Sequence, residues 1–184
     1  ILIGSSDGLF RYSVEDQSMR SINNDRNKGL IILDDELLVA SYGTLYTYKG
    51  NTLRNLSQKK YFVRSIKRSE IDPDVILIGT PSGLEAIRRN NENWDELGYL
   101  AECTGEAASI VENPKTKEIF VGTDFRGLIK VIPNFDQPSD SSIEYLGQEN
   151  GLPNNKEVRV TELDGELRLL TSDGIYKLND LGIE

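Results

Sequence analysis

The sequence predicts an all-β fold assembled from repeated antiparallel sheets, and three observations favour it. One phrase, in which a short apolar run leads into a small residue, a turn and a second apolar run, occurs five times. A strand, a tight turn and a second strand is the natural local structure of such a phrase. The spacing of the five copies and the strand-like segments between them are the other two observations. Together they predict a β-propeller with four-stranded antiparallel blades of about 40 residues.

The spacing of the copies fixes the period of the repeat. The copies are ILIGSSDGLFRY (Ile1–Tyr12), LLVASYGTLYTY (Leu37–Tyr48), ILIGTPSGLEAI (Ile76–Ile87), IFVGTDFRGLIKV (Ile119–Val131) and LRLLTSDGIYKL (Leu167–Leu178). The residues that end the first apolar run are Gly4, Ala40, Gly79, Gly122 and Leu170. They are separated by 36, 39, 43 and 48 residues, with a mean of 41.5. This period is that of a four-stranded propeller blade and is too long for a leucine-rich repeat.

Two further strands accompany most copies. A first strand is expected at YFVRSI (Tyr61–Ile66), AASIV (Ala107–Val111) and EVRVTEL (Glu157–Leu163), before the third, fourth and fifth copies. A fourth strand is expected at NTLRNL (Asn51–Leu56), WDELGYL (Trp94–Leu100) and IEYLG (Ile143–Gly147). Asp-Gly at 164–165 predicts a type I′ hairpin, because both residues accept positive φ. A helix over residues 51–72, which contain no glycine before the proline at 73, is the rival structure there.

The frame of the repeat suggests that the ring is incomplete. The chain opens on the second strand of one blade and ends just past the third strand of a fifth. About four to five blades that start in mid-blade predict a single propeller region over residues 1–184, as a fragment of a larger ring. A closed five-bladed ring is the alternative, and it would require the two partial blades to share one set of strands.

Composition argues against several classes of function. The formal net charge of −9 argues against a nucleic-acid partner, which needs a basic surface. No run approaches 18 apolar residues, so no membrane contact is expected in this segment. Histidine is absent, which removes Ser-His-Asp catalysis and the commonest metal ligand, and one cysteine cannot form an internal disulfide. The nearest approach to a calcium loop is IDPD (Ile71–Asp74), where turn capping explains the acids better. We therefore expect no catalytic residue, metal or cofactor.

The segment GLPNNKEVRVTELDGELRLLTSDGIYKL (Gly151–Leu178) resembles the repeat of two-component regulator propellers. The matching residues are Gly151, Leu152, Pro153, Asn155, Val158, Gly165, Leu167, Thr171, Gly174, Ile175, Tyr176 and Leu178. The five copies cover nearly the whole chain, but only the last has the Gly-Leu-Pro opening. The tryptophan that the family places before Gly-Thr is replaced in every copy, by Leu2, Leu38, Leu77, Phe120 and Arg168, and Leu170 stands where the family has glycine.

The resemblance implies a non-enzymatic, ligand-sensing propeller domain of a membrane-bound signalling protein of the histidine kinase type. Such a domain is periplasmic, as the extracytoplasmic part of an inner-membrane protein. The implied partners are a small extracellular ligand such as an oligosaccharide, and a second copy in a homodimer formed through the full-length protein. A propeller scaffold for protein–protein interaction is the alternative, and a carbohydrate-active enzyme with two carboxylates is a third possibility.

Candidate ligand-binding residues lie at one edge of the predicted sheets. In a propeller, the turns between second and third strands and the connections between blades emerge on one face, where loops on a rigid scaffold bind ligands. Pro81, Ser82, Arg26, Lys60, Glu102 and Asn154 belong to this edge. The residues expected to bind the ligand are Tyr42, Asp124, Phe125, Arg126, Asp173 and Lys156. The rings of Tyr42 and Phe125 would stack on a sugar ring, while Asp124 and Arg126 would form hydrogen bonds with hydroxyls or a carboxylate. A plain surface insertion is the alternative for the longer TDFRG turn.

Overall fold

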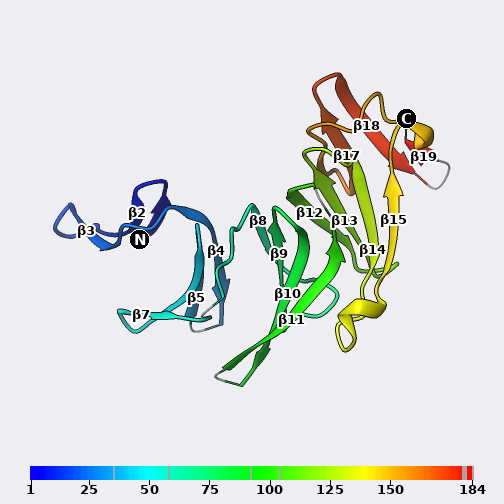
Figure 1. Cartoon of the computed structure of the whole chain (residues 1–184). Helices are drawn as coiled ribbons and strands as arrows, with labels where there is room; N and C mark the ends of the chain where they lie inside the picture. Colours follow the sequence, from blue (N-terminus) through cyan, green and yellow to red (C-terminus); the bar gives the residue numbers. More distant parts are fainter. Residues whose placement is uncertain (35, 58, 92, 104, 180–181, 184) are drawn as a thin grey trace. The chain divides into compact units, whose positions relative to one another are not determined.

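The computed structural model describes residues 1–184 except 35, 58, 92, 104, 180–181 and 184 (Figure 1). Within this described part, regular structure is β-strand apart from two short 3₁₀ segments, η1 (Pro138–Asp140) and η2 (Gln148–Asn150). The all-β prediction is confirmed, and the described residues of the 51–72 segment form strands and loops in place of the rival helix. The contacts divide the chain into two compact units, unit 1 (Ile1–Val63) and unit 2 (Arg64–Glu184). That one propeller region spans both stays a prediction.

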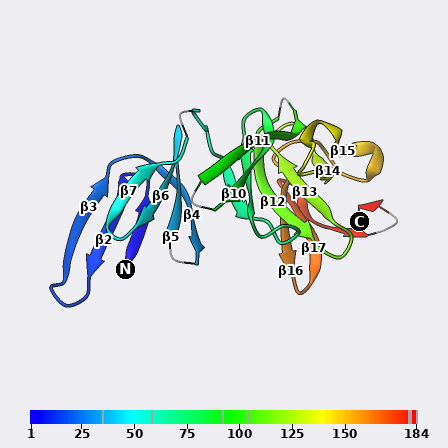
Figure 2. The same cartoon turned by 90° about the horizontal axis from the view of Figure 1, so that it is seen from below.

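Unit 1 contains two antiparallel sheets whose strands follow one another in sequence order (Figure 2). The first sheet comprises β1 (Leu2–Ser5), β2 (Gly8–Ser13) and β3 (Ser18–Asn23). The second comprises β4 (Asn27–Leu33), β5 (Glu36–Ser41), β6 (Thr44–Lys49) and β7 (Thr52–Asn55).

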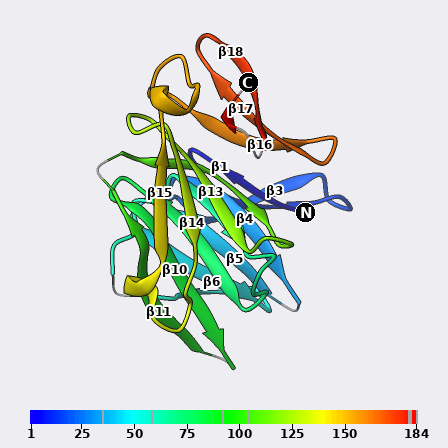
Figure 3. The same ribbon diagram turned by 90° about the vertical axis from the view of Figure 1, so that its right-hand side faces the viewer.

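Unit 2 contains three four-stranded antiparallel sheets (Figure 3). The first comprises β8 (Ser65–Arg68), β9 (Val75–Thr80), β10 (Gly83–Asn90) and β11 (Asn93–Glu102). The second comprises β12 (Ala107–Asn113), β13 (Glu118–Thr123), β14 (Leu128–Ile132) and β15 (Ser142–Leu146). The third comprises β16 (Arg159–Leu163), β17 (Glu166–Thr171), β18 (Gly174–Asn179) and β19 (Gly182–Ile183). The first strand β12 lies beside both β8 and β16, so neighbouring sheets approach through their first strands. These repeated sheets are consistent with a β-propeller-like fold.

The five repeated phrases are all hairpins, as predicted: four join the second and third strands of a four-stranded sheet, and the first joins β1 and β2 of the three-stranded sheet. Asp164 and Gly165 have φ values of 54° and 76°, which confirms the tight Asp-Gly turn. Two boundaries differ from expectation. The first strand expected at 61–66 is β8, which begins only at Ser65, and the short β19 follows the third strand of the last sheet.

The glycine one residue before the end of the second strand is required by the neighbouring sheet. An added Cβ on Gly79 would lie 2.1 Å from the Ala107 carbonyl oxygen at the start of β12. On Gly122 it would lie 2.6 Å from the Val158 carbonyl oxygen, beside β16. Neither residue has a positive φ, unlike the turn glycines Gly83 and Gly127 at 129° and 74°. Glycine at this position of the repeat therefore lets two backbones approach closely, whereas the turn glycine avoids the strain of a positive φ.

The threonine that follows this glycine closes the turn. The Thr80 hydroxyl donates to the Gly83 carbonyl oxygen (3.1 Å) and accepts from the Ser82 amide (3.2 Å). The Thr123 hydroxyl likewise donates to the Gly127 carbonyl oxygen (2.9 Å) and accepts from the Arg126 amide (2.8 Å). These bonds hold the turn residues in one conformation, because the hydroxyl supplies the partners that a short turn leaves unmet.

The second strands form the buried centre of each unit. Residues 75–78 of β9 are fully buried, as are 38–40 of β5. In unit 2, β9 and β10 pack against β13 and β14 in one apolar cluster that includes Leu77, Leu84, Val121 and Ile129. Strands buried on both faces need no apolar–polar alternation, which explains the continuous apolar runs of the repeat.

Candidate functional site

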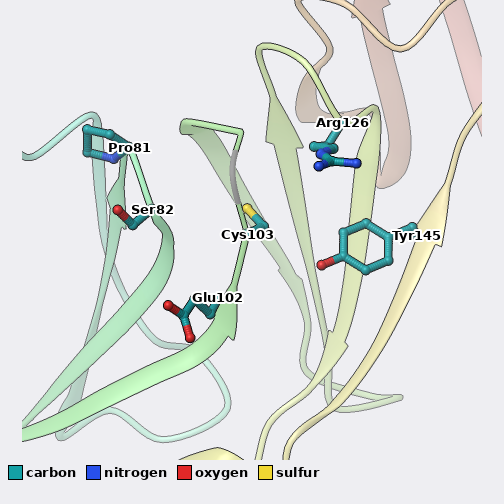
Figure 4. A pocket seen from close by; sticks show the side chains of 6 residues that line it. All are labelled: Pro81, Ser82, Glu102, Cys103, Arg126 and Tyr145. Carbon is teal, nitrogen blue, oxygen red and sulfur yellow. The ribbon is translucent and has the colours of Figure 1, made fainter.

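A cavity of about 800 Å³ opens in unit 2 between the sheet of β8–β11 and the sheet of β12–β15 (Figure 4). Figure 4 shows Pro81 and Ser82 on one side and Arg126 and Tyr145 on the other, with Cys103 between them. The lining comes from four places in the chain. The lining residues are Pro81 and Ser82 in the β9–β10 turn, Glu102 and Cys103 at the end of β11, Arg126 in the β13–β14 turn, and Tyr145 in β15.

One wall is fixed by backbone contacts between the β9–β10 turn and the end of β11. The Cys103 amide donates to the Ser82 carbonyl oxygen (2.8 Å). An added Cβ on Gly83 would lie 2.1 Å from the Ala101 carbonyl oxygen, so only glycine permits this approach. The two chain segments that supply Ser82 and Cys103 are therefore held together.

The opposite wall is fixed in the same manner. The Gly127 amide donates to the Asn155 carbonyl oxygen (2.9 Å), and the Asp124 carbonyl oxygen accepts from the Glu157 amide (2.9 Å). The stem of Arg126 lies against Gly105, where an added Cβ would be 2.7 Å from the Arg126 Cγ. The turn is thus tied to the 151–158 connection, and the direction in which Arg126 leaves the backbone is set.

The lining combines one cation, one anion and one aromatic ring. Arg126 and Glu102 are exposed at the cavity, and Tyr145 is 47% exposed. Burial raises the pKa of the Cys103 thiol above its usual value, against smaller opposing effects of the Gly105 amide and the Arg126 charge. A neutral, buried thiol is a poor nucleophile. The chemistry of this lining suits recognition of a ligand with hydroxyls, a negative group and a flat face.

The predicted ligand residues of unit 2 have different environments. Arg126 lines the cavity, whereas the Asp124 carboxylate forms an ion pair with Arg159 at 2.5 Å. Phe125 is exposed. The Asp173 carboxylate accepts a hydrogen bond from the Asn154 side chain.

The structure also brings Lys156 to Asp173 through a shared residue, because the Lys156 amide donates to the Asn154 Oδ1 at 2.7 Å. Tyr42 belongs to unit 1, where its ring packs edge-on against Phe62 with 5.2 Å between the ring centroids. Ligand binding by these six residues stays a prediction.

Sequence reasoning missed two lining residues, Cys103 and Tyr145. A signal for Tyr145 was present, because Ile143 and Tyr145 are two apart in a predicted strand and therefore share one face of it. Pro81, Ser82 and Glu102 were placed at this edge but were not among the predicted ligand residues. Nothing in the sequence around Cys103 distinguishes it from a buried core cysteine.

Among the described residues, no group of three or more His, Cys, Asp or Glu side chains could hold a metal ion. In the same part of the chain, no helix is long and apolar enough to cross a membrane.

Known proteins provide a structural match but no sequence match. No family model matches the chain, and no curated protein matches it either. Two crystal structures of the extracellular domain of BT4673 from B. thetaiotaomicron are similar at 18% identity, with TM-scores of 0.71 and 0.70. BT4673 is described as a hybrid two component system in one and as a one component system in the other. They cover 95% and 100% of this chain, which spans only 25% of either domain.

A third similar structure is the N-terminal domain of Nup159, at 13% identity and a TM-score of 0.62, covering 99% of this chain and 56% of that one. A shared arrangement of strands does not by itself fix a function. At such low identity, the comparisons show that the chain shares their fold.

Proposed function

We propose that this chain is part of a β-propeller that recognises a small ligand in the extracytoplasmic region of a two-component signalling protein. The cavity carries the proposal, because it joins a cation, an anion and a ring on turns fixed by backbone hydrogen bonds. The fold shared with the extracellular domain of BT4673 supports the sensing role and the extracytoplasmic location. The sheets would then be blades, and the chain would be a fragment of a larger ring.

The ligand is proposed to be an oligosaccharide with a negative group, bound without chemical change. Arg126 would take the negative group, Glu102 would accept hydrogen bonds from hydroxyls, and Tyr145 would pack against a sugar ring. A cavity of about 800 Å³ is within the size range of small-molecule sites. The lining lacks a paired acid and base, and its thiol is held neutral, so recognition fits it better than catalysis.

Binding of an oligosaccharide panel to the purified chain tests this function. Members that raise the melting temperature would then be titrated by calorimetry into the wild type and the Arg126→Gln variant. Loss of a charge-assisted hydrogen bond predicts binding at least about tenfold weaker in the variant. Arg20→Gln is the matched control, since Arg20 is exposed on β3 of unit 1. Equal binding by wild type and Arg126→Gln, or no binding by any oligosaccharide, would contradict the proposal.

A protein-binding scaffold is the second candidate. It is favoured by the Nup159 likeness, since a S. cerevisiae complex of Nup159 with Dbp5 and Gle1 is also among the similar structures. A scaffold would bind protein through exposed side chains. In that case neither the wild type nor the Arg126→Gln variant would bind an oligosaccharide.

A further inference from the structure

Unit 1 carries a compact surface group at the edge where β5 turns into β6. Three chain segments meet there. The Tyr42 amide donates to the Arg26 carbonyl oxygen (2.7 Å), and Tyr42 also forms an isolated antiparallel bridge with Phe62. The Gly43 amide donates to the Tyr61 carbonyl oxygen (2.9 Å), which ties the turn to the 61–63 segment a second time. The backbone under this group is therefore fixed.

The pairing places three side chains in a row. Opposed residues of antiparallel segments point to the same side, and Tyr42 is opposed by Arg26 on one side and by Phe62 on the other. The ring contact agrees, since the Tyr42 and Phe62 centroids are 5.2 Å apart with planes at 61°. Lys60 is counted with the group because it is exposed and lies two residues before Phe62, with the buried Tyr61 between them. We call Arg26, Tyr42, Phe62 and Lys60 the Tyr42 row.

Exposure of the two rings needs an explanation. Tyr42 is 51% and Phe62 is 43% exposed, although large aromatic side chains stabilise a protein most when buried. Tyr61 and Val63 on the opposite side of the same segment are fully buried and hold it in place. The exposed rings are thus not required to anchor the segment, and two rigid aromatic faces beside two cations form a surface suited to ligand stacking.

We propose that the Tyr42 row binds an acidic oligosaccharide, with a sugar ring on the aromatic pair and a carboxylate or sulfate at Arg26 and Lys60. The charge balance of unit 1 favours an anionic ligand at the Tyr42 row. Unit 1 has 8 Lys and Arg against 7 Asp and Glu, whereas unit 2 has 13 against 23. The near-neutral unit repels an anion less than the acidic unit 2 does, where the ligand proposed for the cavity would depend on the local charge of Arg126.

The same numbers argue against single-stranded nucleic acid, the other ligand that aromatic rings and cations attract. Nucleic acid carries one charge per nucleotide and is held by many cations at once. A unit with net charge near zero cannot supply them, while an oligosaccharide has fewer charges and more hydroxyls. The inference rests on the proposed function for its ligand class but uses residues of unit 1 alone.

The test is calorimetric titration of the full chain with tetragalacturonate, a neutral galactose tetramer and the DNA oligomer dT10. We expect binding of tetragalacturonate, weaker binding of the neutral tetramer and none of dT10. Tyr42→Ala and Phe62→Ala should each weaken tetragalacturonate binding about tenfold, as expected for loss of one stacking ring. Tyr42→Phe keeps the ring and should bind as the wild type does. Arg26→Gln should weaken the acidic tetramer and leave the neutral one unchanged.

The controls separate this inference from the proposed function. Arg54→Gln removes an exposed cation of β7, and Ile32→Ala removes an exposed apolar side chain of β4, so both should bind normally. Tetragalacturonate binding that is unchanged in Tyr42→Ala and Phe62→Ala but weakened in Arg126→Gln would overturn the Tyr42 row and leave the proposed function standing. Binding of dT10 as tight as that of tetragalacturonate would overturn the ligand class.

Discussion

Replacement of Gly79 by alanine tests the reason for the glycine in the repeat. The new methyl carbon would lie 2.1 Å from both the Ala107 carbonyl oxygen and the Ser65 Oγ. Ordinary contact begins at 3.4 Å, so the deficit is 1.3 Å against a backbone atom that cannot rotate away. The Ser65 hydroxyl donates to the same Ala107 oxygen at 2.9 Å, and this bond between neighbouring sheets would also be disturbed.

The expected cost follows from these two effects. Overpacking a rigid site costs about 1–3 kcal/mol, and a disturbed hydrogen bond adds about 1 kcal/mol. A free-energy loss of about 3 kcal/mol lowers the melting temperature of a chain of this size by about 9 °C. Gly98→Ala is the matched control in unit 2, because Gly98 has a φ of 95° and an added Cβ would meet nothing within 4 Å. Backbone strain alone should cost it about 1 kcal/mol, or about 3 °C.

Differential scanning calorimetry of the two variants and the wild type measures these shifts. The order of melting temperatures should be wild type, then Gly98→Ala, then Gly79→Ala. If the melting temperature of Gly79→Ala equals or exceeds that of Gly98→Ala, the close approach of β12 is not the reason for the glycine. Gly122→Ala, with its 2.6 Å approach to the Val158 oxygen, should behave as Gly79→Ala does.

Hydrogen bonds of two buried or partly buried side chains, Glu112 and Tyr46, give two further predictions. Glu112→Ala should lower the free energy of unfolding in urea by about 2 kcal/mol, because the buried Glu112 carboxylate accepts from the Ser69 hydroxyl (2.6 Å) and the Glu70 amide (2.7 Å). A loss no larger than that of Glu118→Ala, which removes a partly exposed ion pair with Lys130 and an exposed hydrogen bond from the Thr116 hydroxyl, would contradict this. Burial and a hydrogen bond to Asp25 raise the pKa of Tyr46 to about 12, so its contribution to stability is present below pH 10 and lost between about pH 10 and 12. The stability difference between wild type and Tyr46→Phe should shrink over that range, and a difference that stays constant would refute the assignment.

The repeat made the strands predictable, whereas side-chain partnerships were not. Each copy carries its own evidence of a hairpin, so the second and third strands followed from sequence alone. The first strand of β8–β11 was placed too early because YFVRSI has apolar residues from Tyr61 onward. In the structure, Tyr61 and Val63 are buried beside the Tyr42 turn, and the strand begins only at Ser65.

The sequence predicted at which edge of the sheets the candidate site residues lie, but not which side chains they contact. The repeat showed that Arg126 lies in a turn, yet its position at a cavity depends on Tyr145, which is 19 residues later and belongs to the fourth strand. Asp124 looked equally suitable, but its pairing with Arg159 involves the following sheet, and no local pattern marks that contact. Such contacts depend on packing between sheets, which a period in the sequence does not specify.

The departure of Leu170 from glycine now has a structural meaning. Its register matches that of Gly79 and Gly122, because each pairs with the residue that follows the turn glycine: Leu170 with Ile175, Gly79 with Leu84, and Gly122 with Leu128. Leu84 and Leu128 are fully buried, but Leu170 and Ile175 are 37% and 69% exposed. At the position that corresponds to Gly79, the Leu170 side chain takes up the space that β12 occupies beside Gly79. Any element that packs against β17 must therefore lie farther from it than β12 lies from β9, so the sheet of β16–β19 cannot receive a neighbour through the same close backbone contact.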